Sequence, residues 1–185
     1  MVIVGAGMAG ARAIIGLRSG GWQGAITLIG EETLLPYDRP PLSKAMLLDE
    51  GMLASLNATL IRGHRVVALD RAARTVSLDD GRVIAYDKLL IATGAKPRRL
   101  SLPGGELAYV LRDYGEADHL RDRLRHSASA AIIGGGFIGV EVASSARKLG
   151  CAVALIEAQP RILMRGVPEE IAAVVHARHL AAGVD

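Results

Sequence analysis

Six glycines could bind phosphate groups, because they form the pattern G-x-G-x-x-G twice. They are Gly5, Gly7, Gly10, Gly134, Gly136 and Gly139. In a loop of this kind the first glycine permits a tight turn, the second lets a pyrophosphate approach the backbone, and the third lets the following helix pack closely on the strand. The phosphates then accept hydrogen bonds from free N–H groups at the start of that helix. Each copy therefore predicts a dinucleotide-binding loop.

An acidic residue follows each loop at the spacing expected for a ribose contact. Glu31 lies 21 residues after Gly10 (31 minus 10), and Glu157 lies 18 after Gly139 (157 minus 139). Both spacings fit the ~20 residues after which an acid binds the ribose hydroxyls. Two loops, each with its acid, predict two dinucleotides. One natural pairing is FAD, held tightly, with a nicotinamide nucleotide that binds and leaves.

The acid of the second loop also bears on which nicotinamide nucleotide is bound. Glu157 can accept a hydrogen bond from a 2′-hydroxyl and would repel a 2′-phosphate, which favours NADH. Arg161 and Arg165 follow closely in the sequence and could accept that phosphate instead. We therefore expect NADH, with NADPH as the less favoured alternative.

A short loop, YDRPPLSK, carries two further candidates. Pro40 and Pro41 exclude helix and central strand and hold the chain extended. Arg39 and Lys44 stand on either side of them, so two cations are presented on a stiff segment. Such a segment could meet an anionic cofactor with little ordering cost.

The elements around both loops predict an α/β fold. An apolar run at 1–4, a helix over 11–18 and a second strand at 25–30 make one βαβ unit. The pattern returns 129 residues later (134 minus 5), with strands at 130–133 and 152–156 around a helix that ends near 149. Charged and apolar patterns also predict helices over 114–126 and 168–182.

A different pattern lies between the two units. Residues 45–62 predict a partly helical connection, and three short strand-like runs separated by turns predict an antiparallel β-meander at about 64–87. A strand at 88–92 follows. We expect an FAD-binding domain over 1–111 and an NAD(P)H-binding domain over 112–185. The fold class is thus α/β, with two Rossmann-like βαβ units and an inserted antiparallel β-meander.

Composition excludes several other classes of protein. The 185 residues carry a net charge of only +3 and 3% aromatics, without the basic runs and stacking rings of nucleic-acid binders. No apolar run reaches membrane-spanning length. Cys151 is the single cysteine, which fits a reducing cytoplasm. His176 and His179 lack a third ligand, so we expect no metal site.

Several stretches together resemble a known family. They are VIVGAGMAG, LPYDRPPLSK, DGRVIAYDKLLIATGAKPR, LRD and IIGGGFIGVEVA. In this order they resemble the FAD-dependent NAD(P)H:ferredoxin and rubredoxin reductases, a putidaredoxin reductase-like branch of the pyridine nucleotide-disulfide oxidoreductase superfamily. Members are about twice this length, so the resemblance implies that both βαβ units are incomplete here and that further strands and an interface domain lie outside this sequence.

The resemblance implies a role for each matching residue. FAD would be held by Gly5, Gly7, Ala9, Gly10, Glu31, Arg39, Lys44, Val66, Thr93, Gly94 and Arg112. NADH would be held by Gly134, Gly136, Phe137, Ile138, Gly139 and Glu157. Val66 would meet the adenine through its backbone, and Arg112 would contact FAD near the crossover to the second domain.

The resemblance also implies a catalytic pair. Glu141 lies two residues after Gly139, which places it in the first turn of the expected helix, and the matching family residue faces the lysine that matches Lys44. We expect a Lys44–Glu141 ion pair at the reactive edge of the flavin. Lys44 would stabilise negative charge on the reduced flavin, and Glu141 would position Lys44.

The position of the cysteine narrows the expected reaction. Disulfide-reducing relatives carry cysteines near the YDRPPLSK loop, where this chain has none. We therefore expect electrons to pass from flavin directly to a ferredoxin- or rubredoxin-type acceptor. The alternative is a truncated, non-catalytic fragment that binds FAD and NAD.

Overall fold

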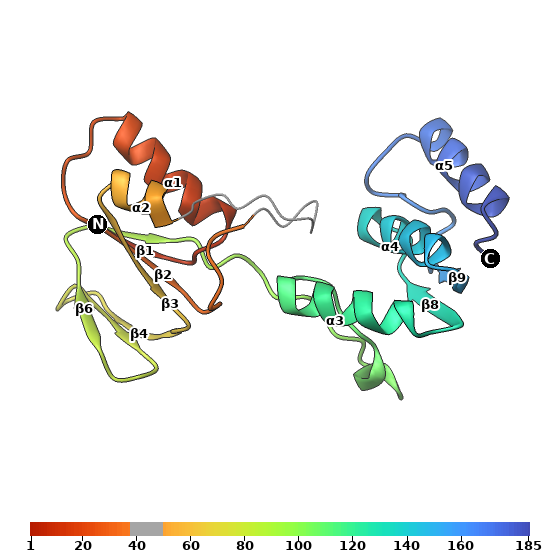
Figure 1. The fold of residues 1–185 in the computed structure, drawn as a ribbon, viewed down its shortest axis with the longest axis horizontal. Helices are drawn as coiled ribbons and strands as arrows, with labels where there is room; N and C mark the ends of the chain where they lie inside the picture. Colours follow the sequence, from red (N-terminus) through yellow and green to blue (C-terminus); the bar gives the residue numbers. More distant parts are fainter. Residues whose placement is uncertain (38–49) are drawn as a thin grey trace. The chain divides into compact units, whose positions relative to one another are not determined.

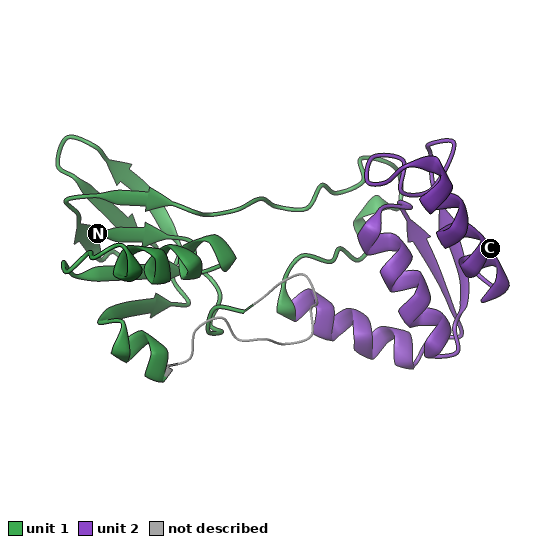
Figure 2. Ribbon diagram, turned by 90° about the horizontal axis from the view of Figure 1, so that it is seen from above, with its two compact units in different colours: residues 1–114 green, residues 115–185 purple. Residues whose placement is uncertain are grey.

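The computed structural model describes residues 1–37 and 50–185 and divides into two compact units (Figures 1 and 2). Unit 1 is Met1–Tyr114 and unit 2 is Gly115–Asp185. The elements of unit 1 are β1 (Val2–Val4), α1 (Met8–Ser19), β2 (Ile26–Gly30), α2 (Glu50–Ser55), β3 (Ala58–Arg62), β4 (Val66–Asp70), β5 (Thr75–Leu78), β6 (Val83–Ala85), β7 (Leu89–Ile91) and the short 3-10 helix η1 (Gly105–Leu107). Helix α3 (Tyr114–Arg125) leads into β8 (Ser129–Ile133), α4 (Phe137–Lys148), β9 (Ala152–Ile156) and α5 (Glu169–Ala181).

A parallel sheet forms the centre of unit 1. Its strand order is β3-β2-β1-β7, and β1 pairs with β2 and β7 on either side. Strand β1 is buried on both faces, as parallel strands usually are. Ile3 packs towards Ile14 of α1, whereas Val2 and Val4 pack towards the meander. This arrangement confirms the predicted Rossmann-like unit.

Strand β3 was not predicted. The sequence indicated a partly helical connection over 45–62, but within its described part a short helix, α2, is followed by β3, paired in parallel with β2 from Ala58 to Arg62. A five-residue run with mixed polarity gives a weak local strand signal. Pairing with β2 supplies the hydrogen bonds that stabilise it.

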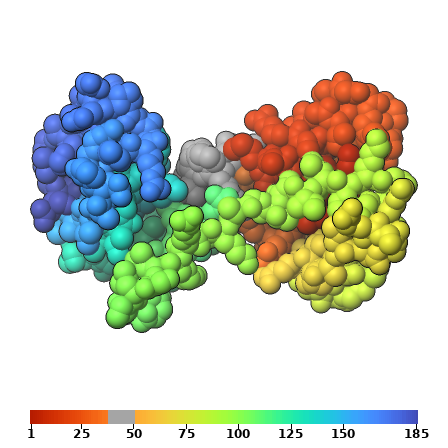
Figure 3. Space-filling view, turned by 180° about the vertical axis from the view of Figure 1, so that it is seen from behind, coloured from red at the N-terminus to blue at the C-terminus, as the bar shows by residue number. Residues whose placement is uncertain are grey.

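The antiparallel meander is confirmed. Strands β4, β5 and β6 pair in that order, with a β-bulge between Val66 and Ala68. Val76 and Leu78 of β5 are almost fully buried against the parallel sheet. Figure 3 shows the meander in yellow to yellow-green along one side of unit 1.

Unit 2 repeats the strand, glycine loop, helix and strand of unit 1. Strands β8 and β9 pair in parallel, and Val153 of β9 also bridges Val184 near the end of the sequence. One core cluster joins Leu124 of α3 to Ala143 of α4 and Val153, and a second joins Val140 of α4 to Ala172 of α5. Among the described residues, none of the helices has the length and apolar character needed to cross a bilayer.

The repeat extends to an arginine at the end of each loop helix. Arg147 follows Arg18 by the same 129 residues (147 minus 18). Each donates through Nη1 to the carbonyl oxygen four residues on, Trp22 at 2.6 Å and Cys151 at 2.7 Å. Each also donates through Nε to a carbonyl just after a later helix, Arg18 to Leu56 after α2 (2.6 Å) and Arg147 to Ala182 after α5 (2.8 Å). The arginine therefore ties three segments of each unit together.

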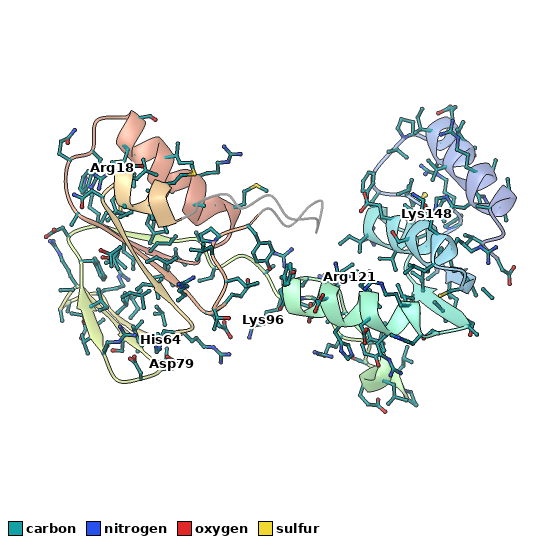
Figure 4. All side chains as sticks on the ribbon, in the orientation of Figure 1. Arg18, His64, Asp79, Lys96, Arg121 and Lys148 are labelled. Atoms are coloured by element: carbon teal, nitrogen blue, oxygen red, sulfur yellow. The ribbon has the colours of Figure 1, made fainter. Side chains whose placement is uncertain are left out.

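Loss of the Arg18 side chain should destabilise unit 1. Arg18 also donates to the Gly24 and Asn57 carbonyls, and it is labelled in Figure 4, in the last turn of α1. Arg18→Ala leaves these carbonyls without their charged donor, which should cost roughly 3 kcal/mol of unfolding free energy. The single tryptophan, Trp22, lies in unit 1, so denaturant unfolding followed by its fluorescence reports this unit. Arg12→Ala, on the exposed side of the same helix, should change stability by less than about 0.5 kcal/mol.

Candidate functional site

The first glycine loop needs glycine at two positions for its own folding. Gly5 has φ +113°, and a Cβ there would lie 2.2 Å from the Ala92 carbonyl oxygen at the end of β7. A Cβ on Gly10 would lie 2.0 Å from the Gly5 oxygen. These contacts bring α1 close to the strands, which is the packing expected of the first and third glycines.

The middle glycine has no such steric need. Among the described residues, no heavy atom beyond its chain neighbours lies within 4 Å of the position a Cβ would take on Gly7. Its φ of −81° suits any residue. The space in front of Gly7 is therefore open, as it must be if a pyrophosphate approaches the backbone there.

The second loop repeats this geometry. Gly134 has φ +106°, and a Cβ on Gly139 would lie 1.9 Å from the Gly134 oxygen. Gly136 has φ −77°, and in the described part of unit 2 its Cβ position also faces open space. Gly7 and Gly136 are the N-caps of α1 and α4 and have no side chain to cap them. Each helix start thus presents N–H groups and a positive dipole end to a ligand.

Glu31 lies directly after β2, close to the first loop. A Cβ on Gly30, the preceding residue, would be 2.5 Å from the Ala6 side chain, so the strand end and the loop touch. Arg65 donates to Glu31 Oε1, through Nε at 3.1 Å and through Nη2. This hydrogen bond, with the charge of Glu31, raises the pKa of the Arg65 guanidinium. Sequence reasoning missed Arg65, because it lies 34 residues from Glu31.

Glu157 contacts its own loop. Its carboxylate accepts hydrogen bonds from the backbone N–H groups of Gly135 (2.7 Å) and Gln159 (2.8 Å). The bonds from Gln159 and then Gly135 lower the pKa of Glu157 below its ordinary range, and the charge of Arg165 adds to this. Glu157 is therefore ionised at neutral pH and held beside the second loop.

A pocket of about 390 Å³ opens between the second loop and the segment after β9. It is lined by Gly135, Gly136, Phe137, Glu157, Gln159, Leu163, Met164, Arg165 and Gly166. Hydrogen bonds to backbone oxygens fix the far wall: the Leu163 N–H donates to the Gly135 oxygen at 2.7 Å, and the Arg161 guanidinium donates to the Ile162 and Val167 oxygens. Arg161 is thus engaged in holding the wall, whereas Arg165 lines the pocket with Glu157.

Acidification should loosen the link between Glu157 and the second loop. Because the pKa of Glu157 is lowered by folding, its stabilising effect is complete above the ordinary glutamate pKa and is lost as pH falls through the lowered value. Amide hydrogen exchange of Gly135, corrected for intrinsic rate, should therefore accelerate as the pH falls below the ordinary glutamate pKa and through the lowered pKa of Glu157. The Glu157→Gln chain should lack this step, and a Gly135 profile identical in both chains would contradict the assignment.

The other predicted residues fall into three groups. Gly94, with φ +72°, follows β7 and Thr93, and the Arg112 guanidinium lies 3.4 Å from its Cβ position, so these residues lie together. Val66 opens β4 next to Arg65. Ala9, Phe137 and Ile138 lie in the first turns of α1 and α4, the last two more than half exposed.

The predicted catalytic pair is only partly described. Arg39 and Lys44 fall within residues 38–49, outside the described residues. Glu141 is the fifth residue of α4 and is exposed, so its expected place in the first turn is wrong by a residue. The Lys44–Glu141 ion pair stays a prediction.

Cys151 and His179 each make contacts within unit 2. Cys151 is fully buried, with Sγ 3.2 Å from the Leu124 and Ser127 oxygens. His179 has both ring nitrogens 2.9 Å from backbone carbonyl oxygens. These contacts account for both side chains by packing and hydrogen bonding.

One histidine and two aspartates lie close enough to share a cation. Ligand atoms of His64, Asp79 and Asp80 lie within 4.8 Å of one another, and Figure 4 shows His64 and Asp79 side by side. His64 Nδ1 is 3.2 Å from Asp79 and 3.3 Å from Asp80, whose carboxylate also accepts from Arg82 at 2.6 Å. Arg82 pairs with Asp80, and His64 lies within hydrogen-bond distance of both aspartates, so contacts among these side chains account for the cluster.

Known proteins resemble this chain in both sequence and structure. The family model of pyridine nucleotide-disulphide oxidoreductases matches residues 1–185. A ferredoxin–NAD(+) reductase component of the p-cumate 2,3-dioxygenase system from Pseudomonas putida is 46% identical, with 100% of this chain and 49% of that protein aligned. A rubredoxin-NAD(+) reductase from Pseudomonas putida is 42% identical over 100% of this chain and 51% of its own length.

Two solved structures that superimpose well on this chain are also of reductases. A ferredoxin reductase from Rhodopseudomonas palustris superimposes with a TM-score of 0.93 at 38% identity, covering 99% of this chain and 48% of that one. The reductase in a covalent putidaredoxin reductase–putidaredoxin complex gives 0.91 at 37% identity, over 100% and 48%. The chain spans about half the length of the curated relatives it matches. Because the family model spans every residue of the sequence, the chain belongs to the pyridine nucleotide-disulphide oxidoreductase family.

Proposed function

We propose that this chain is the dinucleotide-binding part of an FAD-dependent reductase that takes hydride from NADH and passes electrons to a ferredoxin- or rubredoxin-type acceptor. The observation that carries the proposal is the open space at Gly7 and Gly136, in two loops whose first and third glycines are required by a positive φ or by close packing. At these two positions the fold would accept a larger residue, so a ligand that approaches the backbone explains why the residue is glycine. The relatives named as ferredoxin and rubredoxin reductases support the choice of reaction.

Unit 1 would be the FAD-binding domain. The N–H groups of the first loop and of Ala9 would hold the pyrophosphate. Glu31, held in position by Arg65, would accept hydrogen bonds from the ribose hydroxyls. Val66, Thr93, Gly94, Arg112, Arg39 and Lys44 would contact other parts of the cofactor. Bound FAD supplies a flavin that accepts two electrons as hydride and can release them singly.

Unit 2 would be the NAD(P)H-binding domain. The second loop, including Phe137 and Ile138, lines the start of α4, and the ionised Glu157 borders the adjoining pocket. An ionised carboxylate favours a free ribose hydroxyl over a 2′-phosphate, which supports NADH over NADPH. Arg165 in the same pocket reduces this preference without reversing it.

Lys44→Met should slow flavin reduction more than it weakens NADH binding. We propose that Lys44 stabilises negative charge on the reduced flavin, with Glu141 positioning it, so its loss should slow hydride transfer about 10- to 100-fold. Stopped-flow reduction over a range of NADH concentrations separates the rate from the dissociation constant. Unchanged reduction kinetics would remove Lys44 from the mechanism, and Lys96→Met is the matched control.

The acceptor would receive electrons directly from flavin. Cys151, the single cysteine of this sequence, is buried in unit 2, so a dithiol relay within these residues is not available. We further propose a cytoplasmic location, where NADH is supplied, with neither a membrane nor a nucleic acid as partner.

The experiment that tests the proposal uses the purified 185-residue chain. Incubated with excess FAD and desalted, it should retain yellow flavin, and NADH should bleach that flavin under anaerobic conditions. A chain that binds FAD and NADH but is not bleached would favour the alternative, a non-catalytic nucleotide-binding fragment. Colourless protein would contradict both.

A further inference from the structure

Tyr37 is a buried tyrosine that the predicted site does not include. It follows the almost fully buried Pro36, and only 7% of Tyr37 is exposed. A tyrosine this deeply buried needs partners for its hydroxyl, because an unpaired polar group is costly away from water.

The hydroxyl of Tyr37 links two distant segments of unit 1. It donates to Glu32 Oε2 at 2.7 Å and accepts from the backbone N–H of Tyr114 at 2.8 Å. Tyr114 is the first residue of α3, so its N–H is one that the helix itself leaves unpaired. The two tyrosine rings also meet edge to face, with centroids 6.0 Å apart at 72°.

Both segments carry residues of the first dinucleotide site. Glu32 directly follows Glu31, the ribose residue, and its carbonyl also accepts from Gly63 at 3.1 Å. Tyr114 lies two residues after Arg112, whose guanidinium lies beside Gly94. One hydroxyl therefore connects the end of β2, near the ribose contact, to the segment that carries Arg112.

We propose that Tyr37 is a positioning residue for the first dinucleotide site, fastening the start of α3 to Glu32 and so placing Arg112 beside Gly94. The inference rests on the proposed FAD site in unit 1 and adds a residue to it. Tyr37 acts through Arg112, so it should affect the part of FAD that Arg112 meets and spare the adenylate part, which the first loop and Glu31 hold.

Tyr37→Phe tests the proposed positioning role, because it removes the hydroxyl and retains the aromatic ring. The dissociation constant for FAD should rise about tenfold, whereas that for ADP, which offers only the adenylate half, should change less than about twofold. In an Arg112→Ala background, Tyr37→Phe should have no further effect on FAD. Tyr86→Phe, a partly buried tyrosine of the meander side of unit 1, is the matched control and should leave both constants unchanged.

A second readout needs no cofactor. In the ligand-free chain, Tyr37→Phe should accelerate hydrogen exchange of the Tyr114 amide about tenfold, with Trp22 fluorescence confirming that unit 1 is folded. An unchanged Tyr114 amide, equal losses for FAD and ADP, or the same FAD loss with and without Arg112 would each overturn the proposal. A wild-type chain that binds no FAD overturns the proposed function and the cofactor role together, and the amide result then shows separately whether the hydrogen bond exists.

Discussion

Replacing Gly7 by alanine should weaken FAD binding at least about 100-fold and leave unit 1 nearly as stable as before. The added methyl group meets only open space in the described part of the protein, and φ of −81° is allowed for alanine. Alanine is a poorer N-cap than glycine but loses less chain entropy on folding, so stability should change by less than about 1 kcal/mol. The methyl group keeps the pyrophosphate away from the helix N–H groups, and two lost charged hydrogen bonds amount to roughly 3 kcal/mol.

Gly16→Ala supplies the matched control for this prediction. Gly16 is exposed in the middle of α1, and apart from the backbone of that helix no described heavy atom lies within 4 Å of its Cβ position, so the same substitution is made on the same helix, away from the loop. It should stabilise α1 by about 0.5–1 kcal/mol and leave FAD affinity unchanged. Fluorescence titration of FAD measures the affinity, and Trp22 emission in denaturant measures stability. Equal FAD affinity in Gly7→Ala and wild-type chains would show that the loop is only a turn.

Replacing Glu157 by glutamine should remove most of the preference for NADH over NADPH. The wild-type carboxylate, kept ionised by two backbone N–H groups, would stand close to a 2′-phosphate. Repulsion between unit charges about 5 Å apart amounts to about 3 kcal/mol at an effective dielectric constant of 20. We therefore expect roughly 100-fold tighter binding of NADH in the wild-type chain and a ratio within about tenfold in Glu157→Gln.

The comparison is made by calorimetric titration of both nucleotides into both chains. Glu170→Gln, in the first turn of α5 and outside the pocket lining, removes the same charge from unit 2 and should leave the ratio unchanged. If Glu157→Gln kept the wild-type ratio, another pocket residue would determine the choice. If the wild-type chain preferred NADPH, Arg165 rather than Glu157 would dominate the pocket.

Sequence patterns predicted the parts of the fold whose signals are local. The apolar run of β1, the G-x-G-x-x-G loop and the helix α1 occupy one continuous stretch, so periodicity and glycine spacing identify them together. The second copy of this strand, loop and helix pattern makes the prediction stronger. In the meander, side chains alternate with a period of about two residues, which differs from the helical period of about 3.6. Strand β3 was missed because its identity depends on pairing with β2 rather than on its own sequence.

Sequence patterns point to the glycines and acids of the candidate site but not to the contacts that hold them in place. Arg65 and Tyr37 contact residues far along the chain, which no local pattern marks. Arg161, named from the sequence only as a possible phosphate acceptor, donates to backbone carbonyls. The position of Tyr114 opposite Tyr37, 77 residues apart, illustrates this. Long-range hydrogen bonds of this kind follow from the packed fold, so they become visible only with the structure.

We propose that each unit binds its own dinucleotide through the open face of its middle glycine. Binding titrations of FAD and of NADH into both the Gly7→Ala and the Gly136→Ala chains separate the two sites. Gly7→Ala should lose FAD and keep NADH, while Gly136→Ala should lose NADH and keep FAD, and both should fold like the wild type. Two variants that lose neither nucleotide, or that each lose both while folded, would contradict it.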